Sequence, residues 1–199
     1  MSNKIIDARG LPCPQPVILT RNAMREADEV TTLVTGADQV ANVRRLAEKA
    51  GWQVDVSEGA EGFSIALRRT GQAAAVAPEP EPETAGPGGP SVVAVPSDQM
   101  GRGEPELGGV LVRAFFHTLT EMEELPRAIV FYNTGVKLAV QGSPIADDLC
   151  ALASRGVEVL VCGTCLGYYD LRDKVAAGVV SNMYTIAETL LRAGNVVSL

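Results

Sequence analysis

The order of apolar and polar residues in positions 1–70 predicts a small domain of two helices and four strands. Apolar residues recur at helical spacing after Asp38, which we expect to cap that helix, and Gly51 stands where such a helix ends. Two segments of alternating apolar and polar residues follow, which is typical of a β-hairpin. The predicted elements are strand 4–8, helix 14–27, strand 30–35, helix 39–50 and a hairpin turning at 58–61. This βαβαββ order favours a two-layer sandwich with both helices on one face of the sheet.

Residues 91–199 show a different pattern, in which short and almost continuous apolar runs alternate with helical segments. Such runs are typical of parallel strands buried on both faces, so we expect a mainly parallel α/β sheet with helices on both faces. The longest helix is predicted over 106–124, and Phe116 falls outside its apolar stripe. That stripe comprises Leu107, Val110, Leu111, Ala114, Phe115, Leu119 and Met122. The predicted strands are 92–95, 128–132, 157–162, 179–182 and 196–199, and the last helix is 184–193.

The segment 71–90 separates these two parts. It contains 5 of the 12 prolines, carries only acidic charge and has no periodicity, which is typical of an extended linker. The sequence therefore predicts an α/β protein of two domains, at 1–70 and 91–199, joined by a linker at 71–90.

Charge excludes several classes of function. The formal net charge is −7, and no part of the chain has the clustered lysine and arginine that nucleic acids or anionic membranes require. The first residues lack the apolar core of a signal peptide, and no apolar run approaches the ~18 residues of a membrane span. We expect a cytoplasmic protein that binds neither nucleic acid nor membrane. In that compartment the 4 cysteines point to catalysis, redox chemistry or metal binding rather than to structural disulfides.

Cys13 lies between two prolines at the start of the first predicted helix. Pro14 would occupy the first helical position, where its ring is already set for helical backbone angles, which makes Cys13 the cap residue. Pro16 would lie in the first turn, whose N–H groups have no helical partner. The helix is therefore expected to begin abruptly at the sulfur atom.

The surroundings of Cys13 favour a thiolate. The free N–H groups of Gln15 and Val17 and the positive end of the helix dipole would stabilise the anion, and Arg9 would add charge. The single histidine, His117, belongs to the other domain, so a cysteine–histidine dyad is not expected. The alternative is that Cys13 is a small buried apolar residue beside a turn.

A second thiol site follows the predicted strand 157–162, which carries Cys162 to its carboxyl end. Open α/β sheets place their ligands at that edge. The loops at 96–98, 133–137 and 181–182 follow the neighbouring strands and are expected to converge on the same rim. The residues that we single out in the longest of these loops are Asn133, Gly135 and Lys137, the last as a partner for a thiolate or another anion.

Cys162 and Cys165 form a CxxC pair, which suits thiol–disulfide exchange. The pair is also half of a zinc site, but only Cys150 and His117 remain in this domain as further ligands, so neither a metal nor a cofactor is expected. A purely structural role, with two small residues ending a buried strand, stays open.

The segment from Asp7 to Pro16 contains a CPxP signature that starts the first helix after an initial strand. Together with the βαβαββ order, it resembles the SirA/TusA family of small sulfur carriers over residues 4–69. The resemblance implies that Cys13 would carry the transferred sulfur as a persulfide. The supporting positions of the motif correspond to Asp7, Gly10, Pro14 and Pro16.

The second domain resembles the DsrE/DsrF-like family of sulfur-relay proteins, in which a cysteine follows the corresponding strand. By position that cysteine is Cys162, and Cys165 is additional. The resemblance also implies a homo-oligomer formed through this domain.

The fusion of both halves, with NTGVK in one loop and VCGTC in another, resembles the YedF group of sulfurtransferase-like selenium metabolism proteins. The resemblance implies a donor protein and a downstream acceptor for sulfur or selenium. Our leading hypothesis is a sulfurtransferase-like relay from Cys13 to Cys162, with Cys165 resolving the product. Two alternatives are a thiol–disulfide oxidoreductase that uses Cys162 and Cys165, and a non-enzymatic module that binds a small anion.

Overall fold

The computed structural model describes residues 3–12, 14–69 and 90–199. The chain divides into two compact units, Met1–Glu81 and Pro82–Leu199. Cys13 lies outside the described residues, as does the predicted linker apart from Pro90. No helix in the described ranges is both long and apolar enough to cross a membrane.

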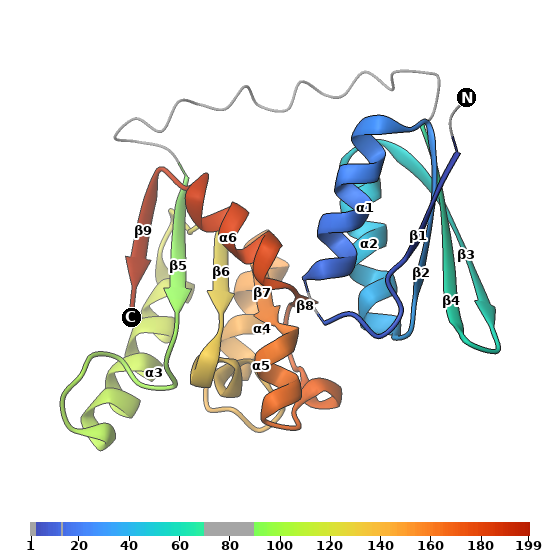
Figure 1. Cartoon of the computed structure of the whole chain (residues 1–199). Coiled ribbons are helices and arrows are strands. Elements are labelled where there is room, and N and C mark those ends of the chain that lie inside the picture. Colours follow the sequence, from blue (N-terminus) through green and yellow to red (C-terminus); the bar gives the residue numbers. More distant parts are fainter. Residues whose placement is uncertain (1–2, 13, 70–89) are drawn as a thin grey trace. The chain divides into compact units, whose positions relative to one another are not determined.

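The first unit is a four-stranded sheet covered on one face by two helices (Figure 1). Its strands run in the order β1-β2-β4-β3, with β1 parallel to β2 and the other neighbours antiparallel. The elements are β1 (Asn3–Asp7), α1 (Gln15–Glu26), β2 (Glu29–Val34), α2 (Ala37–Lys49), β3 (Trp52–Gly59) and β4 (Gly62–Arg69). The predicted βαβαββ sandwich is confirmed.

Alternation along β2 builds the interface between this sheet and its helices. Val30, Thr32 and Val34 are buried, and the residues between them are partly exposed. The Thr20 hydroxyl on α1 donates to the carbonyl of Pro16 over 2.7 Å and lies 2.9 Å from the hydroxyl of Thr32. Because Thr20 has used its only hydrogen, Thr32 is the donor in the second bond. This buried pair fixes the position of α1 along β2.

The cap of α2 differs from the sequence-based expectation. The cap residue is Gly36, and Asp38 lies in the first turn, where its charge still suits the helix dipole. The side-chain oxygen of Gln39 accepts the N–H of Gly36 over 3.1 Å. Gln39, from inside the helix, therefore plays the capping role that we had expected of Asp38.

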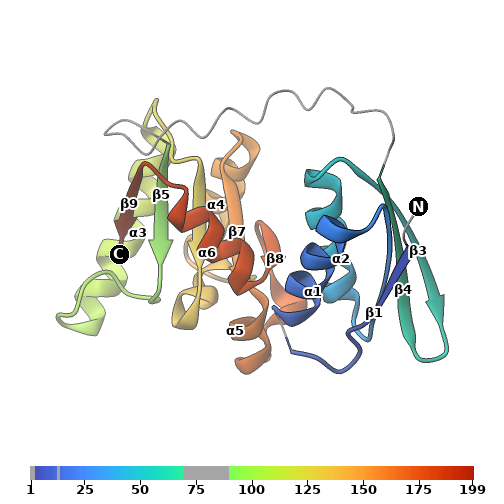
Figure 2. The same ribbon diagram turned by 45° about the horizontal axis from the view of Figure 1, so that its top comes forward.

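The second unit contains a five-stranded parallel sheet in the order β8-β7-β6-β5-β9. Figure 2 shows α3 and α4 on one face and α6 on the other, as expected for near-continuous apolar strands. Its strands are β5 (Ser91–Val95), β6 (Ala128–Phe131), β7 (Glu158–Cys162), β8 (Val179–Ser181) and β9 (Asn195–Ser198). The helices are α3 (Pro105–Glu121), α4 (Ala146–Ser154), α5 (Gly163–Tyr168) and α6 (Met183–Leu191), with 3-10 turns η1 (Asn133–Ala139) and η2 (Arg172–Lys174).

The predicted buried face of α3 is wrong in part: Leu119 is buried as expected, but the helix is rotated relative to the predicted stripe. Phe116, which the sequence stripe excluded, is 0% exposed and stacks on Phe131 of β6 with ring centroids 5.9 Å apart. Leu111 is 42% exposed, although the stripe placed it in the core. A Cβ atom on Gly108 would lie 2.9 Å from the Cβ of Gln99, so the helix backbone approaches the preceding loop closely at this point. Because of this close approach and the bulk of Phe116, the face of α3 that carries Gly108 and Phe116 packs against the protein. The face with more apolar residues, which includes Leu111, is left more exposed.

Candidate functional site

The CxxC pair lies where β7 passes into α5. Cys162 is the last residue of β7 and the cap of α5, and Cys165 lies in the first turn. Both are free thiols with different exposure: Cys162 is 1% exposed, whereas Cys165 is partly exposed. A Cβ atom on Gly163 would lie 3.0 Å from Val180, so this glycine allows α5 to begin directly against β8. An incoming reagent therefore meets Cys165 first.

The loop after β6 contacts the sulfur of Cys165. The main-chain N–H of Asn133 donates to Sγ over 3.1 Å. Asn133 has a φ of 52°, in the left-handed region that asparagine tolerates better than most residues. Burial raises the pKa of the Cys165 thiol, the N–H of Asn133 partly lowers it, and a hydrogen bond with the Cys162 side chain raises it again. The net shift is upward, so Cys165 is held more firmly as a neutral thiol than a free cysteine is.

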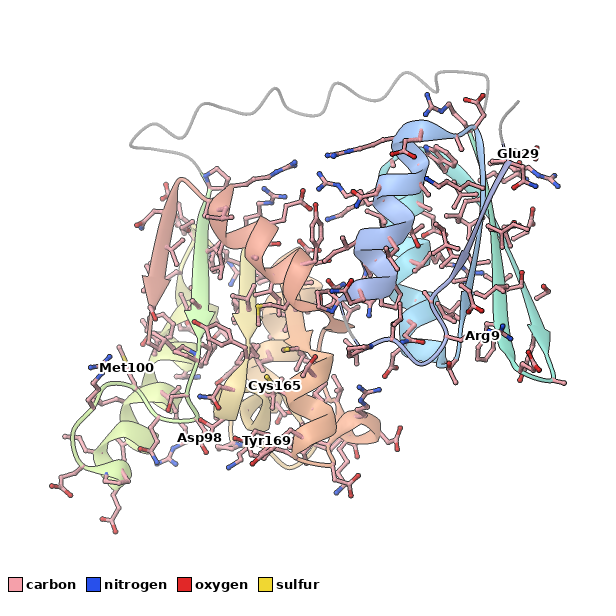
Figure 3. All side chains as sticks on the ribbon, viewed as in Figure 1. Arg9, Glu29, Asp98, Met100, Cys165 and Tyr169 are labelled. Carbon is pink, nitrogen blue, oxygen red and sulfur yellow. The ribbon has the colours of Figure 1, made fainter. Side chains whose placement is uncertain are left out.

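The same loop is fixed to the end of β5. A Cβ atom on Gly135 would collide with the carbonyl oxygen of Val95, so no other residue fits there without movement. The hydroxyl of Thr134 accepts the N–H of Asp98 over 3.3 Å. Figure 3 shows Cys165, Asp98 and Tyr169 toward the same end of the sheet. The loops after β5 and β6 are therefore in contact with each other, and Asn133 brings them to the CxxC pair.

Lys137 contacts a carboxylate and an aromatic ring. Its Nζ lies 3.8 Å from a carboxylate oxygen of Asp98 and 4.8 Å from the ring centroid of Tyr169. Lys137 is not among the groups that shift the pKa of Cys165. Within the described part of the chain, Lys137 thus contacts the loop after β5 and the residue that follows α5, and its role toward a thiolate or another anion stays a prediction.

The start of α1 differs from the prediction by one residue. The helix begins at Gln15, and Pro14 is the cap residue rather than the first helical residue. The N–H of Gln15 donates to the carbonyl of Pro12 over 2.9 Å, and that of Val17 to the carbonyl of Pro14 over 3.1 Å. Both amides that we expected to stabilise a thiolate are thus already used in main-chain hydrogen bonds at the start of the helix. Cys13 itself lies outside the described residues.

Arg9 is neutralised by carboxylates. It contacts Asp7 through two hydrogen bonds of 2.9 and 2.8 Å and also binds Glu61 in the hairpin turn. Hydrogen bonds from Arg9 lower the pKa of Asp7 to about 2, and the same partners raise the pKa of Arg9. The expected extra positive charge near Cys13 is therefore balanced by two negative groups.

Two residues that the sequence analysis did not single out hold the loop before Cys13. The N–H of Gly10, at a φ of 70°, donates to the hydroxyl of Thr35 over 2.9 Å. The side-chain amide of Gln39 donates to the carbonyl of Leu11 over 2.9 Å while its oxygen caps α2. The spacing of Gly36 and Gln39 resembles a capping box and signals the cap, but no local pattern reveals the bond to Leu11.

The remaining candidate metal ligands are engaged elsewhere. His117 lies 3.5 Å from a carboxylate oxygen of Asp148, and the sulfur of exposed Cys150 lies 3.7 Å from the carbonyl of Ala176. Across residues 3–12, 14–69 and 90–199, no three histidine, cysteine, aspartate or glutamate side chains are grouped as metal ligands would be.

Two family models match the two units of this chain. Residues 4–69 match the sulfurtransferase TusA family, and residues 109–199 match the DsrE/DsrF-like family. The chain joins a TusA domain to a DsrE/DsrF-like domain. We refer to Met1–Glu81 as the TusA unit and to Pro82–Leu199 as the DsrE unit. Proteins of both families work in sulfur relay with partner proteins, and sulfur carriage is the general role of this chain.

Solved structures resemble each unit separately. The TusA unit is similar to a SirA-like protein from Desulfitobacterium hafniense, with 31% identity over 33% of this chain and 95% of that protein, at a TM-score of 0.32. The DsrE unit is similar to a protein of unknown function from Methanobacterium thermoautotrophicum, with 19% identity over 56% of this chain and all of that one, at a TM-score of 0.43. It is also similar to the ychN protein from E. coli, with 17% identity over 55% and 99% of the two chains and a TM-score of 0.41.

Proposed function

We propose that the protein is a thiol-based sulfur transferase that carries sulfane sulfur as a cysteine persulfide. Cys13 delivers the sulfur in this proposal, and the Cys162–Cys165 pair accepts it. The observation that supports it best is the pairing of a partly exposed thiol, whose sulfur accepts a main-chain N–H, with a buried thiol beside it. Such a pair at the carboxyl end of a parallel sheet lies where this fold places its ligands.

Transfer needs no external oxidant. The Cys165 thiolate attacks the outer sulfur of the donor persulfide, and the bond between the two donor sulfurs breaks. The donor cysteine leaves as a thiolate and takes up the proton that Cys165 lost. The outer sulfur is now bound to Cys165, so the number of persulfides is unchanged.

Exposure suggests an order for the two acceptor thiols. From the sequence we expected Cys162 to accept the sulfur and Cys165 to resolve the product. That assignment stays a prediction, but burial of Cys162 favours the reverse order, with Cys165 as the first acceptor. The N–H of Asn133 then supports the sulfur on which negative charge appears.

We also propose selenium as an alternative cargo, because the same thiolates would attack the outer selenium of a selenosulfide as they attack the outer sulfur of a persulfide, with the donor thiolate leaving in both cases. This part rests on the resemblance to the YedF group. A cytoplasmic location fits the proposal, since thiols stay reduced there. Self-association through residues 91–199 stays a prediction.

Mass spectrometry of the reduced full-length protein tests the carrier chemistry. The protein is incubated with a small-molecule persulfide, and separately with a small-molecule selenosulfide (RS–SeH), and each added atom is located on its cysteine. We expect adducts on Cys13 and, at early time points, on Cys165. Cys165→Ser should abolish loading of the DsrE unit, and Cys150→Ser, as the matched exposed control, should not. Equal labelling of Cys150 and Cys165, or no adduct at all, would overturn the proposal.

A second candidate function is thiol–disulfide exchange, which is favoured by two free thiols at CxxC spacing at the start of α5. In that case the Cys162–Cys165 disulfide should have a reduction potential of about −180 to −300 mV, as in cytosolic exchange proteins. Catalysed reduction of a model disulfide, without any persulfide adduct, would favour this candidate over sulfur transfer.

A further inference from the structure

One buried hydroxyl beside the CxxC pair has no hydrogen-bond partner. Ser181, the last residue of β8, is 0% exposed, and its Oγ is unpaired. Among the described residues only two other buried polar side-chain atoms share this condition, and both are on α2 of the TusA unit. Burial of an unpaired hydroxyl is costly, so its presence here needs an explanation.

The register of the sheet places this hydroxyl next to Cys162. Cys162 and Ser181 are paired residues of the parallel strands β7 and β8. Paired residues on adjacent strands direct their side chains to the same face, and the strands are about 4.8 Å apart. A Cβ atom on Gly163 would lie 3.2 Å from the carbonyl oxygen of Ser181, which shows how closely the start of α5 packs here.

The neighbouring polar residue is already accounted for. The Asn182 side chain caps α6 by accepting the N–H of Thr185 over 3.1 Å, and its amide donates to the hydroxyl of Thr185. Ser181 therefore supplies the unused hydrogen-bond donor at this strand end. A rotation about its side-chain bond moves the hydroxyl relative to the Cys162 sulfur without any change in the backbone.

We infer that Cys162 releases the sulfur carried on Cys165 as sulfide, and that the Ser181 hydroxyl supports the Cys162 thiolate in this step. The inference rests on the proposed function, because it requires sulfur on Cys165. It assigns the protein a second activity, reductive release, beyond carriage of the sulfur.

The release step balances in atoms and electrons. Cys162 loses its proton to solvent, and its thiolate attacks Sγ of Cys165. The bond between Sγ and the outer sulfur breaks, and the outer sulfur leaves with the electron pair as hydrosulfide. The two protein sulfurs are oxidised to a disulfide and the carried sulfur is reduced by the same two electrons. A cellular dithiol or a small thiol then reduces the disulfide and restores the pair.

The environment of the two thiols suits this division of roles. Cys162 is the cap of α5 and Cys165 lies in its first turn, so the two side chains lie at the same end of the helix, as attack within the pair requires. Burial of Cys162 keeps external persulfides away from it, so it is still a free thiol when Cys165 is loaded. Burial also disfavours a charged sulfur, and a hydroxyl donor offsets that penalty.

The test follows sulfide and disulfide in the full chain with Cys13→Ser and Cys150→Ser, so that only the pair can react. After loading with a small-molecule persulfide and removal of the excess, we expect one sulfide released for each disulfide formed. Cys162→Ser should load Cys165 and hold the sulfur without releasing it. If this variant releases sulfide at the rate of the parent, the release step is wrong. If it never loads Cys165, the proposed function fails, and the inference fails with it.

Ser181→Ala separates a role in the reaction from a structural role. It should load Cys165 as the parent does, release sulfide about tenfold more slowly at neutral pH because the attacking sulfur has lost its hydrogen-bond donor, and recover at higher pH. Its thermal midpoint should be unchanged or higher, because an unpaired buried hydroxyl is removed. Ser181→Thr, which keeps the hydroxyl at a strand position, should restore the pH profile. An unchanged profile with a lower midpoint in Ser181→Ala would show that Ser181 is only structural.

The pH profile can be assigned because the substitution alters no titratable group. The elements around this end of β7 carry other titratable side chains, namely Asp98, Tyr132, Lys137, Cys165, Tyr169 and Tyr184, and all of them stay in place.

Discussion

The main-chain N–H of Asn133 donates a hydrogen bond to the sulfur of Cys165 over 3.1 Å, from a backbone with a φ of 52°. The donor belongs to the loop after β6 and the sulfur to the helix after β7, so the bond joins two neighbouring strand ends. A main-chain donor persists when the side chain is changed. Its geometry depends instead on the left-handed conformation of residue 133.

Cys165 should react as a thiol with a raised pKa. Burial and the Cys162 hydrogen bond outweigh the N–H of Asn133, so alkylation of Cys165 by iodoacetamide near neutral pH should be slower than that of N-acetylcysteine. The rate should still increase above about pH 8.5, where a free cysteine has reached half its maximum. Peptide mass spectrometry of samples quenched across this range measures the profile. Faster alkylation than the free thiol at neutral pH would contradict the prediction.

Asp7 should titrate near pH 2. Hydrogen bonds from Arg9 lower the pKa of its carboxyl from 3.8 to about 2, so the ion pair stabilises the fold fully above the ordinary value. This contribution is lost as the pH falls through about 2. Carbon-detected NMR of the Asp7 carboxyl should show the low midpoint, and Arg9→Gln should return it toward 3.8. Glu61→Gln is the matched control: Glu61 binds Arg9 but is not among the causes of the Asp7 shift, so its removal should leave the midpoint low.

Phe116 should contribute far more to stability than the exposed residues of α3. Truncation of this fully buried ring to alanine removes its stacking on Phe131 and should destabilise the DsrE unit by about 3–5 kcal/mol. Leu111→Ala, on the face that the sequence pattern had assigned to the core, should change stability by at most about 1 kcal/mol. Urea unfolding followed by circular dichroism compares the two variants. Equal losses would mean that α3 packs in the orientation predicted from the sequence.

Gly135 should not tolerate alanine. Its Cβ would collide with the carbonyl of Val95, and a small-to-large change in such a tight place costs about 1–3 kcal/mol. Gly109 in α3 has no atom within 4 Å of a built Cβ, so Gly109→Ala should stabilise the protein by about 0.5–1 kcal/mol. Thermal unfolding of both variants provides the comparison. Stabilisation by Gly135→Ala would show that the loop after β6 is free to move away from β5.

Periodicity predicted the larger features of both units. Continuous apolar runs such as 128–131 indicated a parallel sheet, and the strand-end rule placed Asn133 near the CxxC pair, where the structure has it. Both inferences depend only on the order of residues within and directly after one strand. The orientation of α3 could not be obtained this way, because the helix is apolar around most of its circumference and the contact of Phe116 with Phe131 decides between faces.

The finer arrangement of the site depended on contacts between distant residues. Nothing in the sequence shows that Lys137 pairs with Asp98, that Arg9 binds Glu61, or that the Ser181 hydroxyl is left unpaired. Each of these three features depends on which loops and strands lie side by side in the folded chain. From residue types alone, each side chain could have paired with several others. The one-residue error at Pro14 arose because a proline suits both the cap and the first helical turn.

The buried bond between Thr20 and Thr32 has a consequence for how partners approach the TusA unit. A helix fixed to its sheet by a hydroxyl pair in the core cannot slide along its axis without breaking that bond in an apolar surrounding. Any partner that docked at the start of α1 would therefore meet a helix whose position on the sheet is already fixed. Rigid-body docking of partners is the appropriate starting assumption for this helix, and adaptation on binding should come from the side chains of the partner.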